Sequence, residues 1–371
     1  MIKKFSIFLL IALVIACSSD DNSNGGGSGD NFDRSAMLTN WADNIIIPAF
    51  QSFSNDLTAL ETATTNFTGT VDQTNLNALR TAWFNAYRGW QSVELFNIGM
   101  AESTNYYFNM NTYPSNATEI ESNVTNGGYD LSQINSYDAQ GFPGIDYLLH
   151  GLGATDNEIL DKFSIDSNAA GYRTYLTDLV TRMTTLTQDI LNDWTGSYRD
   201  TFVNSSGNTA TSSVNKLVND FIFYYEKGLR ANKIGIPAGV FSSNTLPDNV
   251  EAFYRKDISK TLTLDGLHAV EDFFNGKHFN SSVTGESMKS YLDYLNTIKD
   301  GENLSVLITN QFNSAESQIG LLTDDYIDQI NTNNNKMLEA YDQLQLAVVL
   351  IKVDMLQAFN ISVDFVDADG D

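Results

Sequence analysis

The chain has 371 residues, of which 42% are hydrophobic and 18% charged, so it can bury a sizeable core, and its length suggests about two domains. It contains 21 Lys plus Arg against 46 Asp plus Glu, and the net charge of −25 repels phosphate backbones, which excludes nucleic acid as a partner. The single cysteine excludes an intrachain disulfide and a thiolate metal site.

The first 16 residues have the features of a bacterial lipoprotein signal peptide. Lys3 and Lys4 precede an apolar run, Phe5–Ile15, that is too short to span a bilayer as a mature helix. The residues Val-Ile-Ala before Cys17 resemble a lipobox, so we expect Cys17 to be the lipid anchor and the first mature residue. The alternative is a buried N-terminal cysteine in an uncleaved chain.

Residues 17–33 are rich in Gly, Ser and Asp and are predicted to form a flexible tether behind the lipid. The acidic residues after Cys17 resemble the surface-export signal of Bacteroidetes lipoproteins. We therefore expect a cell-envelope protein that is anchored to the outer membrane, on its periplasmic or surface face, and touches the membrane only through lipid.

From residue 34 onward the apolar residues recur at helical spacing, which predicts an N-terminal helical bundle over residues 34–200. Its expected elements are a helix outlined by Trp41, Ile45, Phe50 and Phe53, a helix from Leu76 to about Gly99 with Thr74 as N-cap, an ordered loop over Glu102–Gln140, and helices over Ile145–His150 and Tyr172–Trp194.

The Gly-, Ser-, Asn- and Thr-rich stretch Thr195–Ser213 indicates a boundary, and residues 201–371 are expected to form a C-terminal helical bundle. Its predicted helices are Val214–Asn232, Asn249–Phe274, Met288–Lys299, Val306–Ile330 and Lys336–Phe359. The alternation of Ile361, Val363 and Phe365 is the one strand signal. The fold class predicted is therefore all-α, with two helical bundles.

A short internal sequence repeat links the two halves of the chain. Gly144–Gly151 aligns with Ala269–Gly276 at an offset of 125, with a shared order of small, branched, acidic, any, apolar, apolar, polar and Gly residues. Extending the alignment backward gives GFPGID at residues 141–146 and GLHAVE at residues 266–271. This repeat indicates an internal duplication of one helical unit.

The second copy places an imidazole and a carboxylate on one helix face, because His268 and Glu271 are three residues apart. This pair is a half-site for iron, zinc or manganese that other ligands would complete. The alternative is a helical histidine that bonds a neighbouring side chain at a packed surface.

A second set of candidates follows one face of the helix predicted from Leu76. Residues at spacings of three and four along it are Arg80, Trp83, Tyr87, Trp90 and Glu94. Three aromatic residues at this spacing are more typical of a bundle core than of a ligand site. Arg80 and Glu94, at the two ends of this face, are stronger candidates for a site, because a buried charge needs a partner or a cation. Asp146 is a candidate companion for Glu94.

Two other segments carry charge in a pattern. Glu226 and Arg230 are spaced as a helical ion pair that runs into a Gly-Ile-Pro-Ala-Gly turn at residues 235–239. The acidic residues from Asp364 to Asp371 could ligate calcium, but they lack the closing Glu of an EF-hand, so a solvated acidic terminus is favoured.

Several long segments resemble the imelysin-like proteins. They are the lipobox and tether, residues 79–96 (LRTAWFNAYRGWQSVELF), 141–151 (GFPGIDYLLHG), 225–239 (YEKGLRANKIGIPAG), and 349–355 with the terminal Asp-Gly-Asp. The resemblance covers residues 36–371. It implies a pair of helical bundles on the outer side of the envelope, in a family grouped among metallopeptidases with several relatives linked to iron uptake. The family signature GxHxxE falls at residues 141–146, where Pro143 and Asp146 replace His and Glu.

These observations favour an imelysin-like lipoprotein that acts in cation uptake, with iron as the preferred cation and zinc as the alternative, and that binds its ligand in a cleft between the bundles. The candidate metal ligands are Glu94, Asp146, His268 and Glu271, and we assign no catalytic residue. One alternative is a zinc peptidase, which three histidines in the whole chain disfavour. The other is a metal-free module that binds a protein or peptide of the envelope.

Overall fold

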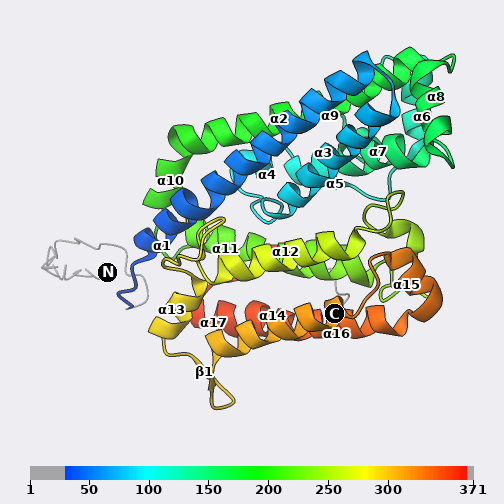
Figure 1. Ribbon diagram of the computed structural model, residues 1–371. Helices are drawn as coiled ribbons and strands as arrows, with labels where there is room; N and C mark the ends of the chain where they lie inside the picture. The colour runs from blue at the N-terminus through cyan, green and yellow to red at the C-terminus, as the bar shows by residue number, and fades with distance from the viewer. Residues whose placement is uncertain (1–29, 366–371) are drawn as a thin grey trace, which may run out of the picture.

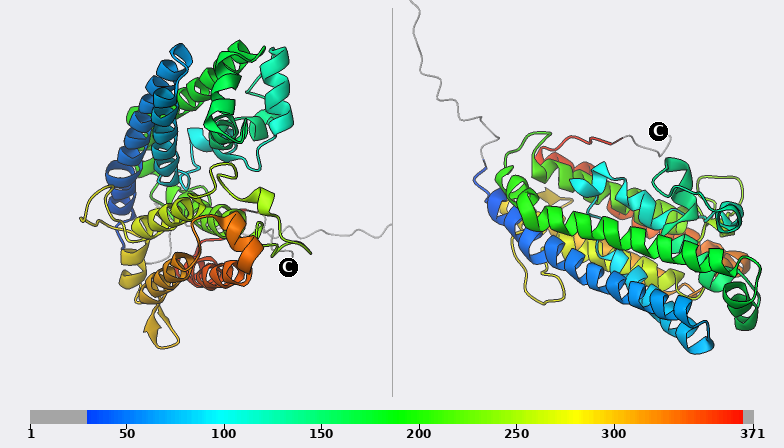
Figure 2. Two further views of the ribbon diagram at one scale, coloured as in Figure 1. Left: turned by 45° about the vertical axis from the view of Figure 1, so that its right-hand side comes forward. Right: turned by 90° about the horizontal axis from the view of Figure 1, so that it is seen from above.

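The computed structural model describes residues 30–365, and apart from two short strands its regular structure is helical, as predicted. Figure 1 shows two groups of long helices, one above the other, with the chain passing from the upper group to the lower one near residue 205. Seen from above in Figure 2, the long helices run in roughly one direction. No helix among the described residues is long and apolar enough to cross a membrane.

The first helix group contains the elements from residue 34 to residue 204. They are α1 (Arg34–Asn40), η1 (Trp41–Ile46), α2 (Ile47–Gly69), α3 (Gln73–Gln91), α4 (Met100–Ser103), α5 (Tyr106–Asn111), α6 (Ala117–Asn126), η2 (Ile134–Ala139), α7 (Gly141–Asp146), η3 (Tyr147–Gly151), α8 (Asp156–Ser164), α9 (Ala169–Asp193), η4 (Trp194–Tyr198) and α10 (Arg199–Asn204).

The second helix group contains the elements from residue 213 to residue 359. They are α11 (Ser213–Phe223), η5 (Tyr224–Gly235), η6 (Pro247–Asn249), α12 (Ser259–Phe274), α13 (Met288–Tyr294), β1 (Ile298–Lys299), β2 (Glu302–Asn303), α14 (Leu304–Gly320), α15 (Tyr326–Asn333), α16 (Asn335–Val348), η7 (Val349–Met355) and α17 (Leu356–Phe359).

The first group is built on one long helical stretch, from α1 through the π-helical turn η1 to α2. Asp33 begins it, because its side chain accepts the backbone N–H of Ala36 at 2.9 Å. Pro48 lies just after the π-helical turn and has no N–H to donate back along the helix, and the carbonyl of Asn44 accepts the N–H of Phe279 at 2.8 Å instead. The apolar residues at helical spacing are fully buried against α3 and α9, as the sequence predicts.

The sequence prediction for the next segments is partly wrong. Helix α3 begins at Gln73 and ends at Gln91, and its N-cap is Asp72 rather than Thr74. The stretch Glu102–Gln140 is not a single loop, because it contains α5, α6 and η2. Helix α6 is capped by Asn116, which accepts the N–H of Glu119, but it buries few apolar residues, so its periodic signal is weak.

The second group also departs from the prediction in places. The segment before α12 is irregular, and the stretch predicted as one helix over Val306–Ile330 is two helices, α14 and α15, separated after Gly320. Residues 361–365 do not form a strand, whereas 298–303 form a two-stranded hairpin. The predicted helix over Lys336–Phe359 is confirmed as the continuous run of α16, η7 and α17.

Aromatic side chains join the two groups. The ring of Phe273 on α12 lies 5.0 Å from Trp41 and 5.1 Å from Phe96 in the first group, and 6.0 Å from Phe221 in the second, between ring centroids. Helix α12 packs against α3 across the same boundary. The predicted division after residue 200 falls within α10, which packs on α1 and η1. The predicted signal peptide, Cys17 and the last six residues lie outside the described residues.

Candidate functional site

Five polar and charged side chains from both helix groups are buried together where the groups meet. We call them the interface cluster: Gln91, Glu94, Asn111, Lys233 and Glu251, each at most 4% exposed. The Nζ atom of Lys233 lies 2.7 Å from Glu251 Oε2 and 2.8 Å from Gln91 Oε1, and 3.5 Å from Glu94 Oε2. The amide of Asn111 donates to both carboxylates, at 2.8 Å to Glu251 and 3.1 Å to Glu94.

Local structure explains why these side chains point inward. Gln91 ends α3, and Glu94 lies in the turn after it, where its N–H still bonds the carbonyl of Trp90 at 2.9 Å. Glu94 therefore continues the buried face of α3. Asn111 ends α5, Lys233 lies on η5, and Glu251 lies in the irregular segment that precedes α12. Four separate parts of the chain meet at the cluster.

Burial and mutual attraction act against each other in the cluster. Burial lowers the pKa of the Lys233 ammonium, but Glu251 and Glu94 outweigh this effect, so the pKa is raised overall. Burial raises the pKa of Glu94, and the charge of Glu251 raises it further, against the opposing effect of Lys233. With both carboxylates ionised the cluster carries a net charge of −1, which favours a cation nearby.

A small pocket of about 180 Å³ opens beside the interface cluster. Asn111 belongs to both, and the other polar residues of the lining include Tyr107, Tyr113 and Asn232. The hydroxyl of Tyr107 accepts the amide of Asn232 at 3.1 Å. The hydroxyl of Tyr113 is buried and has no hydrogen-bond partner among the described residues. Burial, followed by the charge of Glu251, raises the pKa of Tyr113, so this phenol stays protonated.

Asp146, predicted as a companion of Glu94, instead binds backbone N–H groups of the second helix group. It is buried, and its carboxylate accepts the backbone N–H groups of Tyr254 at 2.8 Å and Arg255 at 3.0 Å. It also lies 3.0 Å from Nδ1 of His150, one helical turn further on. Asp146 thus ties α7 of the first group to the segment before α12 in the second. Pro143, also on α7, is buried.

His268 and Glu271 lie on α12, away from the interface cluster. His268 is about half exposed, and its Nε2 lies 2.9 Å from Glu316 Oε1 on α14, a carboxylate that the sequence did not suggest. Burial, with the charges of Glu316 and Asp272, raises the pKa of Glu271. This arrangement matches the alternative interpretation of His268, a histidine on a helix surface that bonds a neighbouring side chain.

The four predicted metal ligands therefore fall in three places: Glu94 in the interface cluster, Asp146 at the end of α7, and His268 with Glu271 on α12. Within residues 30–365, no group of three or more His, Cys, Asp or Glu side chains is arranged to hold a metal ion. In the interface cluster, the ammonium of Lys233 takes the position between the two carboxylates that a cation would occupy. These donors do not fit a directly ligated resident metal.

Sequence reasoning missed Lys233, Glu251 and Asn111. Lys233 lies in the segment 225–239 that was singled out for its turn, but its spacing gave no reason to pair it with Glu94. Glu251 and Asn111 lie in segments with weak periodicity. The available signal was that Lys233 and Glu251 each have apolar neighbours in the sequence, which indicates a charged side chain at a buried position.

The imelysin family model matches residues 46–351 of the chain. The chain is similar in structure to an imelysin-like protein from Psychrobacter arcticum 273-4, with a TM-score of 0.68 and 18% identity over 90% of this chain and 97% of that one. It is similarly close to a protein described as an iron-regulated protein A precursor, from Parabacteroides distasonis ATCC 8503, with a TM-score of 0.70 and 17% identity over 88% and 97%. No curated protein matches the chain.

Proposed function

Because the chain belongs to the imelysin family, we propose that it is an envelope-anchored binding component of iron uptake that accepts a hydrated cation in the pocket beside the interface cluster. The iron-regulated relative in Parabacteroides distasonis supports the link to iron. In this proposal iron is cargo, and the lipid on Cys17 is the anchor to the outer membrane.

The observation that carries the proposal is a pocket with phenol and amide groups in its lining, set against a buried net charge of −1. The lining of this space of about 180 Å³ includes Tyr107, Asn111, Tyr113 and Asn232, together with the apolar side chains of Phe108 and Ile236. A water takes up ~30 Å³ in the liquid, so the space can hold a cation together with several of its waters. The hydroxyl of Tyr113, which has no hydrogen-bond partner among the described residues, and the amide oxygen of Asn232 would bond those waters, and the cluster behind them would attract the charge.

The raised pKa of Glu94 gives this binding a pH dependence. A bound cation favours the ionised carboxylate, so cation affinity should increase as the pH rises through the raised pKa of Glu94. Acidification should release the cation because protonation of Glu94 removes the net negative charge.

The zinc-peptidase alternative has less support in the arrangement of side chains. His150 bonds Asp146, His268 bonds Glu316, and His278 lies in the loop that follows α12. A zinc peptidase needs several of its ligands around one ion. Peptide hydrolysis by the purified protein that is abolished in Glu271→Gln would overturn the binding role.

Calorimetric titration of the lipid-free protein, beginning at Ser18, with Mn²⁺ and with Fe²⁺ under anaerobic conditions tests the proposal. We expect one cation per chain, bound at least tenfold more weakly in Tyr113→Phe and in Glu94→Gln. The matched control is Tyr129→Phe, since the hydroxyl of Tyr129 bonds Asp178 in the first helix group, away from the pocket. The absence of binding in the unchanged protein would leave the third function, a metal-free module that binds an envelope protein or peptide.

A further inference from the structure

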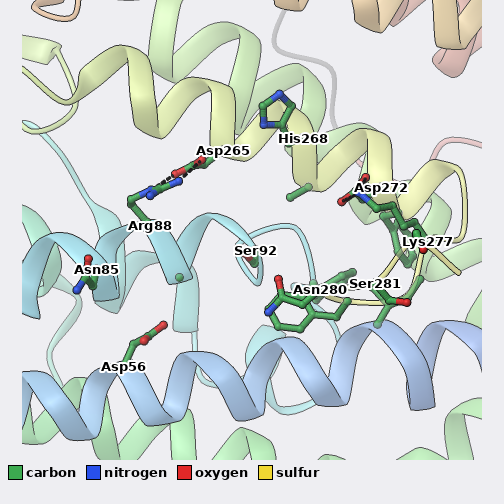
Figure 3. Close-up of a pocket in the computed structure, with 17 residues that line it drawn as sticks. Asp56, Asn85, Arg88, Ser92, Asp265, His268, Asp272, Lys277, Asn280 and Ser281 are labelled. Atoms are coloured by element: carbon green, nitrogen blue, oxygen red, sulfur yellow. Dashed lines mark hydrogen bonds and ion pairs between the residues drawn. The ribbon is translucent and has the colours of Figure 1, made fainter.

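A larger groove lies between the two helix groups, on a different part of their boundary. Figure 3 shows it between α2 and α3 on one side and α12 with the loop after it on the other. Its volume is about 690 Å³, which suits a small organic molecule. The charged side chains that line it are Asp56, Arg88, Asp265, Asp272 and Lys277, with His268 beside them.

Most of these charges are already neutralised within the groove. Arg88 holds Asp265 with two hydrogen bonds, from Nε at 2.7 Å and from Nη2 at 3.0 Å, as the dashed lines in Figure 3 show. Lys277 holds both oxygens of Asp272 at 3.0 Å. His268 is engaged by Glu316. The Arg88–Asp265 pair and the Lys277–Asp272 pair each carry no net charge.

Asp56 is the exception. It projects from α2 into the groove (Figure 3), and it makes no hydrogen bond or ion pair with any of the described residues. It is half-buried, and the loss of water around it raises the pKa of its carboxyl. Gly89 on α3 makes room for this carboxylate, because a Cβ there would lie 2.6 Å from Oδ2 of Asp56. The groove therefore carries one uncompensated negative charge at a defined position.

We propose that the groove binds an organic monocation, a molecule with one ammonium group on an apolar body, whose ammonium pairs with Asp56. The apolar part of the lining matches such a body, since Ile45, Phe96, Phe273 and Phe279 contribute to the walls. A metal ion would need several oxygen ligands, whereas the other carboxylates of the groove are held by Arg88 and Lys277. An ammonium needs only one carboxylate and nearby hydrogen-bond acceptors.

This site is distinct from the pocket beside the interface cluster in its residues and in its ligand. Asp56 and Gly89 contribute nothing to that pocket, and Tyr113 contributes nothing to the groove. Loss of binding at one site is therefore not expected to remove binding at the other.

Calorimetric titration of the purified full-length protein with 2-phenylethylamine tests the inference. We expect one bound molecule per chain, and no binding of 2-phenylethanol, which has the same ring without the charge. In Asp56→Asn the affinity for the amine should fall at least tenfold. Gly89→Ala, which displaces the carboxylate of Asp56, should weaken binding as well, and circular dichroism should show that both variants remain folded.

Asp272→Asn is the matched control, because it makes the same change in charge at a carboxylate that Lys277 already holds. Retention of amine binding in Asp272→Asn, with loss in Asp56→Asn, supports the assignment. An equal loss in both variants would overturn it in favour of a general effect of charge. Displacement of the amine by Mn²⁺ at equal concentration, or equal binding of the alcohol, would also overturn it.

Discussion

The buried charges of this protein find their partners far away along the chain. Lys233 bonds Gln91, which is 142 residues away, and Asp146 accepts the backbone of Tyr254, which is 108 residues away. Burying a charge costs several kcal/mol unless a partner compensates it. The loss of one partner should therefore destabilise the fold much more than the loss of an exposed ion pair.

Lys233→Met tests this at the interface cluster. The change leaves Glu94 and Glu251 without their ammonium, and we expect a loss of about 3–5 kcal/mol in the free energy of unfolding near neutral pH. Urea unfolding measures it. Lys289→Met is the control, since Lys289 and Asp293 form an exposed pair whose loss should cost less than ~0.5 kcal/mol.

The same variant has a definite pH dependence. A carboxyl whose pKa is raised in the folded state stabilises the fold below its ordinary pKa, and this contribution disappears as the pH rises through the raised value. The ordinary value for Glu94 is 4.5, and burial raises it. The deficit of Lys233→Met should therefore shrink as the pH is lowered toward 4.5. A deficit that is the same at pH 5 and pH 8 would contradict this account.

At the scale of the elements, α9 and the run from α16 to α17 were predicted nearly to their ends, whereas the end of α2, the start of α12 and the short helices α5 and α6 were not. Helix α9 buries residues along its whole length, whereas α6 buries only Ile120 and Val124. The signals that divide elements were nevertheless present in the sequence. Gly320 ends α14, and Asp325 caps α15 by accepting the N–H groups of Ile327 and Asp328. A cap of this kind outweighs a continuous apolar pattern.

Gly141, the first residue of α7, occupies a position that we expect only glycine to tolerate. Gly141 has a φ of +68°, and a Cβ at this position would lie 2.2 Å from the carbonyl oxygen of Met110. Gly141→Ala should therefore lower the free energy of unfolding by more than ~1 kcal/mol, as measured in urea. Gly69→Ala is the control, because a Cβ at Gly69, at the end of α2, would have no atom within 4 Å. An unchanged stability in Gly141→Ala would show that α7 can shift away from Met110.

At the scale of the whole molecule, the boundary between the helix groups holds both candidate sites. The interface cluster and the groove each take residues from α3 or the turn after it and from the second group. Aromatic packing around Phe273 holds the boundary together, since its ring contacts Trp41 and Phe96 across it. The relative position of the two groups should therefore depend on this side chain.

Phe273→Ala should lower the free energy of unfolding by about 3–5 kcal/mol, because it leaves a cavity where the two groups meet. Thermal unfolding followed by calorimetry measures it, and loss of the contact should also broaden the transition if the groups then unfold separately. Phe108→Ala is the control, since Phe108 is about half exposed. A sharp transition at an unchanged temperature would show that Phe273 does not join the groups.

Local patterns in the sequence were enough to predict that the chain is helical, to place α9 and the run from α16 to α17, and to find the resemblance to the imelysin-like proteins, because helical spacing and long sequence segments are local properties. It also indicated that Glu94 is buried, since that residue continues the face of Trp83, Tyr87 and Trp90.

The partners of those side chains depend on the tertiary structure. It places Glu94 beside Lys233 and Glu251, Asp146 at the backbone N–H groups of Tyr254 and Arg255, and His268 at the surface beside Glu316. Among the described residues it gives Asp56 in the groove no partner. The physical reason is that periodicity fixes which face of a helix is buried. The partner on that face depends on how distant helices pack, and no local pattern encodes it.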